Sequence, residues 1–162
     1  MVWDRFVRVF HWSLAAGILL NYWVLTAGDP THEWAGYGLV TLVCARVVWG
    51  FIGSPPARFS HFVAGPRRVI RNIRQFRATY QQHNGHSPLA GWMILALLTL
   101  TLATGITGWL QESDAFWGEE WPQILHEWLA NVLLTAAGVH VAAVILIQWR
   151  FGLPLVRSMW RG

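Results

Sequence analysis

The stretch ILHEWLANVLLTAAGVHVAAVILIQW, residues 124–149, carries one charged side chain, Glu127. At a helical rise of about 1.5 Å per residue it is long enough to cross the apolar core of a bilayer. His126 and His140 are 14 residues apart, so they share a helix face and lie about 21 Å apart along its axis. Ionisable groups at membrane depth are costly and tend to face the bundle interior for a functional reason. The stretch therefore predicts a membrane-spanning helix with one functional histidine toward each surface.

The rest of the chain has the composition of a membrane protein. Hydrophobic residues make up 54% of it and charged residues 12%, against about 25% charged residues in a soluble domain. Breaks that contain Gly, Pro, Ser or acidic residues separate the apolar stretches. Besides 124–149, the stretches of spanning length are residues 9–27, 34–52 and 89–110. We expect an all-α membrane protein in which residues 1–162 form a single domain, a four-transmembrane-helix bundle.

Neither the N-terminus nor the cysteine content points to processing or covalent attachment. Residues 1–5 lack the features of a secretory signal, so we expect no segment to be removed. A single cysteine, Cys44, excludes an intrachain disulfide, and no C-x-x-C-H motif could attach a haem covalently. Any haem must be held by coordination alone.

All twelve strongly basic residues are arginines, and they segregate along the chain. Cytoplasmic loops of membrane proteins retain Lys and Arg, so the segregation predicts that both termini are cytoplasmic in a bacterial inner membrane. It also accounts for the basic balance without a nucleic-acid partner. The predicted inner segments hold Arg5, Arg8, Arg58, Arg67, Arg68, Arg71, Arg74, Arg77, Arg150, Arg157 and Arg161, whereas the outer loops hold Asp29, Glu33, Glu112, Asp114, Glu119, Glu120 and Glu127.

The arginine-rich loop contains a pattern of its own. From Pro66 to Tyr80, apolar residues fall near one helical face and arginines occupy the rest. The pattern predicts an interfacial amphipathic helix in the cytoplasmic loop, lying on the lipid of the inner leaflet. Anchoring by positive charge explains it better than recognition of a specific lipid.

Two further histidines match the pair on residues 124–149 in depth. His11 lies at the inner start of the first stretch, level with His140, and His32 lies at the outer start of the second, level with His126. Each pair could clamp a planar macrocycle between two imidazoles in the bundle core. Zinc or copper sites need three or four converging ligands, so axial haem pairs fit better. A single histidine at the membrane interface can be explained without a function. For these four histidines, that explanation would have to apply to each one separately, although they match in depth as two pairs.

Other residues could complete a haem site. Arg46, near the inner level, is predicted to pair with a haem propionate, although snorkelling to the interface explains it nearly as well. Arg8 is a weaker candidate for the same role. His61, His83 and His86 are expected to be solvated or locally packed, with proton relay to a quinone by His61 or His86 as the less favoured role. Glycines thin the helices near both levels or simply serve helix packing: Gly17, Gly36, Gly38, Gly105, Gly108 and Gly138.

Several motifs resemble the prokaryotic cytochrome b561 family, which includes the cytochrome b subunits of nickel-iron hydrogenases. They are VWDRFVRVFHW at residues 2–12, HEWAG at 32–36, RVVWG at 46–50, ARFSHFVAGP at 57–66, and HEWLAN at 126–131 with His140. The resemblance covers essentially the whole chain. It implies a di-haem cytochrome with His11, His32, His126 and His140 at the positions of the axial ligands.

The resemblance also implies a function, transmembrane electron transfer in a respiratory chain between the quinone pool and a periplasmic c-type cytochrome or hydrogenase. The alternative is a superoxide oxidase that reduces ubiquinone, as in one related branch. A haem-bearing anchor of a larger dehydrogenase and a haem-free structural or transport protein are further alternatives. The direction of electron flow and the oligomeric state, a homodimer included, stay open.

Overall fold

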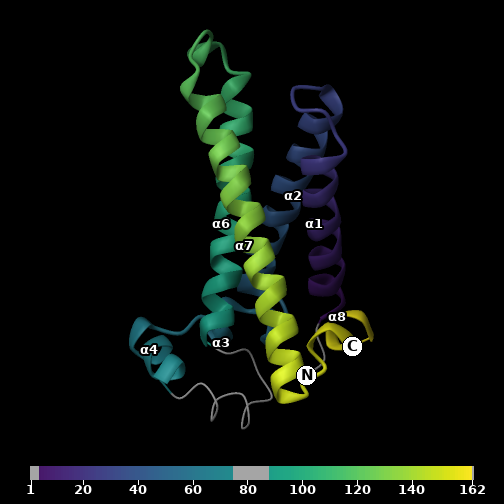
Figure 1. The fold of residues 1–162 in the computed structure, drawn as a ribbon, viewed down its shortest axis with the longest axis vertical. Coiled ribbons are helices and arrows are strands. Elements are labelled where there is room, and N and C mark those ends of the chain that lie inside the picture. The colour runs from purple at the N-terminus through teal and green to yellow at the C-terminus, as the bar shows by residue number, and fades with distance from the viewer. Residues whose placement is uncertain (1–3, 75–87, 162) are drawn as a thin grey trace.

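The structure, a computed structural model, describes residues 4–74 and 88–161. Four long helices run along the molecule, and most of the short helices gather at one end (Figure 1). The long helices are α1 (Arg5–Trp23), α2 (Pro30–Ile52), α6 (Pro88–Gln111) and α7 (Trp121–Phe151). The short ones are η1 (Pro55–Ala57), α3 (Phe59–Phe62), α4 (Pro66–Arg74), η2 (Asp114–Phe116) and α8 (Leu155–Arg161). Across these described ranges the chain is helical with no strand, as the sequence predicts.

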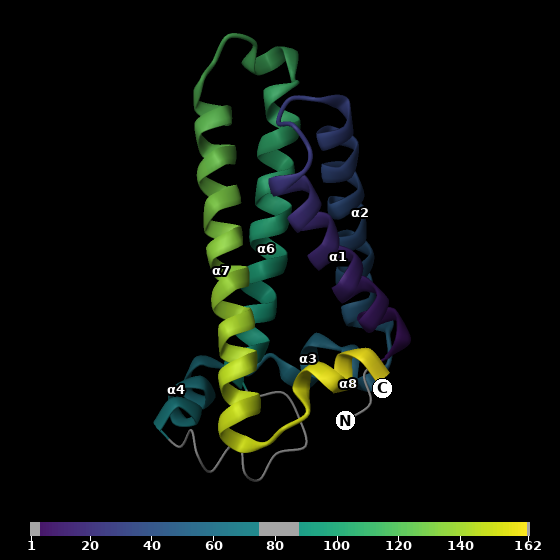
Figure 2. The same cartoon turned by 45° about the vertical axis from the view of Figure 1, so that its right-hand side comes forward.

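The long helices pack in chain order. The α1 helix lies along α2, α2 along α6, and α6 along α7 over most of its length (Figure 2). A small core joins the first three of them, with Phe10 of α1, Val43 of α2 and Leu98 of α6 all buried. Few side chains of α7 are buried, since its outer faces carry exposed apolar residues such as Ile145 and Leu146. Such a surface suits contact with lipid rather than with water.

Three of the helices are long and apolar enough to cross a membrane within the part of the chain that the structure describes: α2, α6 and α7. The chain is therefore a membrane protein. The α1 helix has 19 residues but is not among the three. Its first two turns include Arg5 and Arg8, which lower its mean hydropathy. The predicted fourth span thus rests on the position of α1 beside α2, not on its composition.

The bounds of α1 differ from the predicted apolar stretch of residues 9–27. The helix begins earlier because Asp4 caps it, accepting a hydrogen bond from the Phe6 N–H at 2.7 Å. It ends at Trp23, where the Leu25 N–H bonds the carbonyl of Leu20 at 3.0 Å and closes the last turn. A left-handed glycine, Gly28 with φ of 82°, then turns the chain toward α2.

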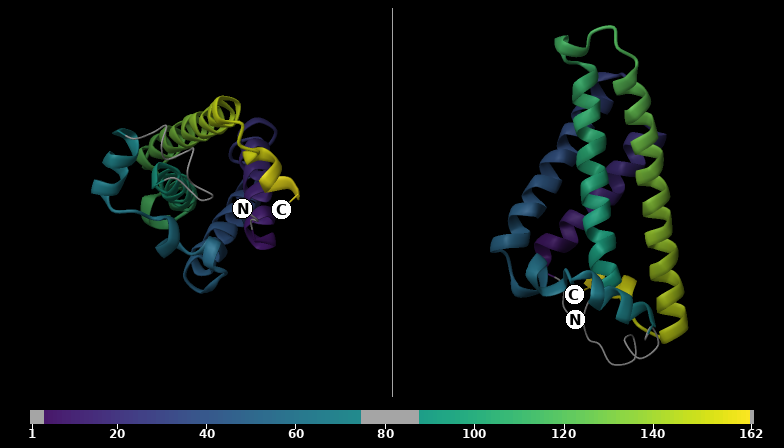
Figure 3. Two further views of the ribbon diagram at one scale, coloured as in Figure 1. Left: turned by 90° about the horizontal axis from the view of Figure 1, so that it is seen from below. Right: turned by 90° about the vertical axis from the view of Figure 1, so that its left-hand side faces the viewer.

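The two ends of the bundle differ in charge. Both termini lie at one end together with α3, α4 and α8 (Figures 1 and 3). We call this the arginine-rich end, because Arg5 begins α1 there, Arg58 precedes α3, and Arg67 and Arg157 lie in α4 and α8. The opposite, acidic end is formed by residues 24–29 and by residues 112–120 with η2.

The predicted loop helix is present in part. It begins at Pro66 as expected and is described as far as Arg74, while the predicted remainder to Tyr80 lies outside the described residues. Arg67, Arg71 and Arg74 are exposed on it. That α4 lies on the surface of a membrane remains a prediction.

Candidate paired-histidine site

Both predicted histidine pairs meet in the structure. His11 of α1 faces His140 of α7 with 6.4 Å between ring centroids, and His32 of α2 faces His126 of α7 with 6.2 Å. The rings of each pair are inclined at 60° and 68°. All four side chains are partly buried. One helix, α7, therefore supplies one imidazole to each of two levels, near the two ends of the bundle.

The spacing within each pair fits one metal atom held from opposite sides. An imidazole nitrogen binds a transition metal at about 2 Å, and the ring centre lies roughly 1.1 Å beyond that nitrogen. Two axial imidazoles therefore have centroids about 6.2 Å apart, close to both observed distances. The ring spacing would therefore suit a haem held by the two imidazoles of each pair.

The surroundings of His126 select its tautomer. Its Nδ1 lies 2.9 Å from the carbonyl oxygen of Thr104 in α6. Because a carbonyl can only accept, Nδ1 carries the proton and donates it, which leaves Nε2 with a free lone pair. Ligating histidines are usually held this way by a partner on the other ring nitrogen. Thr107 Oγ1, at 3.3 Å from the same Nδ1, lies against the ring as well.

Buried polar atoms without a hydrogen-bond partner gather at the same residues. Among the described residues, the side-chain atoms in this state are His11 Nδ1, His32 Nδ1, Arg8 Nε, Arg46 Nη1 and Asn21 Oδ1. Such atoms are rare in native proteins, and each usually signals a missing ion, water or ligand. Four of the five belong to residues that the sequence nominated for haem binding, and the two arginine nitrogens among them would suit the propionates of a haem.

Arg46 does not snorkel to the surface. It is 3% exposed, and its Nη2 donates to the carbonyl of Ala57 at 3.1 Å. Its guanidinium carbon lies 5.2 Å from the ring centroid of Phe59. One nitrogen, Nη1, remains buried without a hydrogen-bond partner, while the Asp4 carboxylate attracts the guanidinium electrostatically.

The glycines nominated from sequence have different surroundings. A Cβ on Gly17 would lie 2.6 Å from Leu39 Cδ2, and one on Gly105 would clash with Val40, so these two serve close helix packing. A Cβ on Gly108 would lie 3.3 Å from His126 Cε1, so this glycine makes room for the imidazole. Positions 38 and 138 face open space, and position 36 meets only Asn21, at 3.7 Å.

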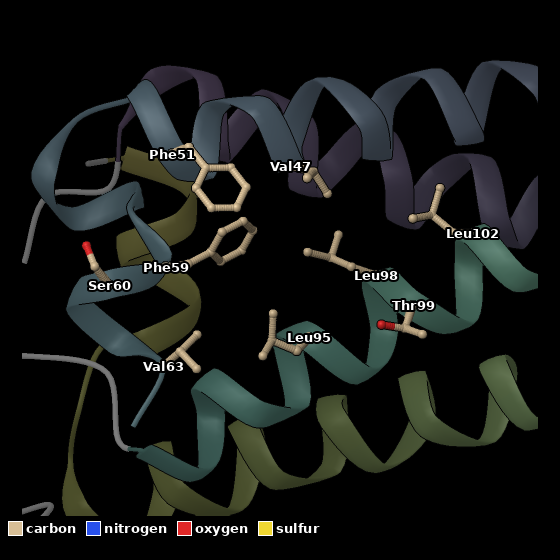
Figure 4. A pocket seen from close by; sticks show the side chains of 9 residues that line it. All are labelled: Val47, Phe51, Phe59, Ser60, Val63, Leu95, Leu98, Thr99 and Leu102. Atoms are coloured by element: carbon tan, nitrogen blue, oxygen red, sulfur yellow. The ribbon is translucent and has the colours of Figure 1, made fainter. Parts of the chain in front are cut away.

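An apolar groove of about 500 Å³ lies apart from the histidines, between α2, α3 and α6 (Figure 4). Phe51 of α2, Phe59 of α3 and Leu95 of α6 are among the side chains that line it. No histidine contributes to its wall. The groove therefore does not belong to the paired-histidine site.

Other metal chemistry has little support in the described ranges, where no three His, Cys, Asp or Glu side chains converge as a zinc or copper site requires. Two imidazoles per level are a donor set for a haem instead. A sequence model of the prokaryotic cytochrome b561 family matches residues 2–162. The chain belongs to the prokaryotic cytochrome b561 family. No curated protein and no solved structure gave a significant match.

Membership of the cytochrome b561 family makes the chain a membrane electron-transfer protein of the haem b type. Two features of the site in this cytochrome were not predicted from sequence. The Thr104 carbonyl behind His126 is a backbone atom of another helix, so no residue type signals it. Asn21 left a weak signal, an amide within the apolar run of residues 18–25. Of the loop histidines, His61 is exposed, while His83 and His86 lie outside the described residues.

Proposed function

We propose that this protein carries electrons across the membrane through two b-type haems, one between His11 and His140 and one between His32 and His126. The observation that carries the proposal is the ring spacing of 6.4 and 6.2 Å at two levels of one bundle. Bound haem would supply reversible one-electron chemistry, which no side chain of this protein offers alone. The electrons pass between the quinone pool and a periplasmic redox partner, a c-type cytochrome or a hydrogenase.

The protein itself orients the histidine ligands, excludes water from the haem sites and places cations near the inner haem. The Thr104 carbonyl keeps the proton of His126 on Nδ1, so that Nε2 remains available as a ligand. Buried apolar residues such as Phe10, next to His11, keep water from the inner level. Arg46, with Arg8 as a second group, offers the inner haem a cationic partner for a propionate.

The proposal includes a topology of four spans, with α1 as the fourth. The α1 helix packs along α2 and carries one member of a histidine pair, a position that a helix outside the membrane could not hold. The arginine-rich end faces the cytoplasm of a bacterial inner membrane, and α4 lies on its inner leaflet. Both termini are then cytoplasmic.

The acidic end is the proposed docking surface for the periplasmic partner. Exposed acids of residues 112–120 stand beside exposed aromatics such as Trp117, which is 88% exposed. A basic surface on the partner would be steered there by charge, and such steering weakens with salt. The rate at which a purified basic c-type cytochrome exchanges electrons with the protein should fall as salt is raised. A rate that does not change with salt would rule out this docking surface.

The decisive experiment is the dithionite-reduced minus oxidised spectrum with pyridine haemochrome quantitation. Wild type should hold two haems b per chain, and His126→Ala should hold close to one. His61→Ala is the matched control, because His61 is an exposed histidine outside both pairs, and it should keep two. A colourless wild type, or a His126→Ala protein with two haems, contradicts the proposal.

A stopped-flow assay with superoxide and ubiquinone distinguishes electron transfer to a protein partner from the alternative function, that of a superoxide oxidase. Catalytic turnover in that assay, without any protein partner, would replace the carrier function with the enzymatic one. The haem sites would stand in either case.

A further inference from the structure

The two histidines at the acidic end differ in what lies behind their rings. His126 donates its Nδ1 proton to Thr104, whereas the Nδ1 of His32 is buried without a partner among the described residues. A ligating histidine almost always gives this proton to an acceptor, which fixes the ring and raises the basicity of the other nitrogen. His32 therefore lacks the hydrogen-bond acceptor that would hold its ring as a ligand.

The helix that carries His32 offers it no such acceptor. His32 stands in the first turn of α2, two residues after Pro30, so no preceding helical turn lies beneath its ring. The Asp29 carbonyl already accepts the backbone N–H groups of His32 and Glu33, at 2.9 and 3.2 Å. A side chain of a neighbouring helix can supply the acceptor that the α2 backbone does not.

The side chain of Asn21 in α1 carries a suitable acceptor atom. Its Oδ1 is buried and unpartnered, the fifth atom of that kind in the described chain and the one outside the nominated haem residues. Its Nδ2 lies 3.7 Å from where a Cβ of Gly36 would stand. Gly36 is four residues after His32 and thus on the same face of α2. The absence of a side chain at Gly36 brings the Asn21 amide to the turn that carries His32.

We propose that Asn21 is the positioning residue of the outer haem, with its Oδ1 accepting the Nδ1 proton of His32 when that ring is ligated. The buried, unpartnered nitrogen of His32 on α2 and the buried, unpartnered oxygen of Asn21, which lies against α2 at Gly36, would satisfy each other in this arrangement. The bond makes the imidazole more electron-donating, which stabilises oxidised iron and lowers the potential of the outer haem. This inference rests on the proposed function.

The test measures the midpoint potential of each haem and the electron paramagnetic resonance spectrum of the oxidised protein. Asn21→Leu removes the acceptor at similar size and should raise the potential of the outer haem alone, with a changed resonance from that haem. Asn21→Asp provides a stronger acceptor and should lower it. Tyr22→Phe is the matched control. Tyr22 follows Asn21 in α1, and its hydroxyl donates a hydrogen bond to Asn131 Oδ1 of α7. The variant removes this bond and should leave both potentials unchanged.

The outcomes separate this inference from the function beneath it. A wild type without two haems overturns the proposed function. Two haems with unchanged outer potential and resonance in Asn21→Leu overturn the role of Asn21 and leave the function standing. If Asn21→Leu loses the outer haem, Asn21→Asp decides, because an unchanged potential in that variant overturns the inference.

Discussion

The Arg46 side chain is a buried cation in a membrane-spanning helix, held by one carbonyl and one aromatic ring. We predict that Arg46→Gln, which keeps an amide donor for the Ala57 carbonyl, lowers the potential of the inner haem by on the order of 50 mV. A change of about 1.4 kcal/mol in the interaction of a charge with a one-electron centre corresponds to roughly 59 mV. Redox titration of the purified variant measures the shift. Arg150→Gln, an exposed arginine at the same end, is the control, and an equal shift there would refute a specific role.

Gly108 lies at the outer level, where the absence of a side chain leaves room for the His126 ring. We expect Gly108→Val to push that ring off its position and to reduce the haem content from two per chain toward one. Gly17→Ala also crowds a neighbour, but the neighbour is Leu39 and not a histidine. That control should destabilise the protein modestly while keeping two haems. Full outer haem in Gly108→Val would mean that the ring has space to move.

At the scale of elements, Asp4 ties the start of α1 to the end of α2. Its Oδ2 accepts bonds from Trp49 Nε1 at 2.9 Å and from Ser54 Oγ at 2.7 Å, while Oδ1 caps α1. Burial alone would raise the pKa of this carboxyl. The hydrogen bonds from Ser54, Trp49 and the backbone outweigh burial and hold the pKa below its usual value of 3.8. These hydrogen bonds of Asp4 fix the depth of α1 relative to α2, and with it the depth of His11.

A carboxyl with a lowered pKa stabilises the folded state only where it is ionised. The contribution of Asp4 is thus present above pH 3.8 and is lost as the pH falls through the lower pKa of the folded protein. We predict that Asp4→Asn, which can still cap α1, costs about 1 kcal/mol at pH 7. Thermal melting in detergent at pH 7 and pH 3 tests this. The gap between the melting temperatures of variant and wild type should be smaller at pH 3 than at pH 7, and an equal gap at both values would exclude the charge as the cause.

How much the sequence predicts differs between elements. The histidine pairs followed from helical rise and chain direction, because a rigid helix fixes the depth of His126 relative to His140. The Thr104 carbonyl, the Asn21 amide and the Tyr22–Asn131 bond did not follow, since each depends on how one helix is rotated against another. The helix α1 begins before the predicted apolar stretch, because the Asp4 cap includes Arg5 and Arg8, which apolar composition excludes.

The whole molecule is an electrical dipole along its long axis. Seven of the eight acids follow α1 or lie between α6 and the first turns of α7, and Asp4 alone belongs to the arginine-rich end. The predicted orientation can be tested by fusing a reporter that fluoresces only in the cytoplasm to the C-terminus. We expect it to fluoresce, because arginine-rich segments are retained inside. Activity of a C-terminal reporter that folds only in the periplasm would invert the topology and, with it, the side of the docking surface.

The same dipole should order the two haem potentials. Reduction adds an electron, so cations near the inner haem stabilise its reduced form and acids near the outer haem stabilise the oxidised form of that one. We predict that the inner haem has the higher potential and that an electron entering at the acidic end moves inward downhill. Each haem can be titrated alone, since His126→Ala should retain the inner haem and His140→Ala the outer one. A higher potential in His140→Ala than in His126→Ala would mean that ligand hydrogen bonds and burial outweigh the long-range charge of the bundle.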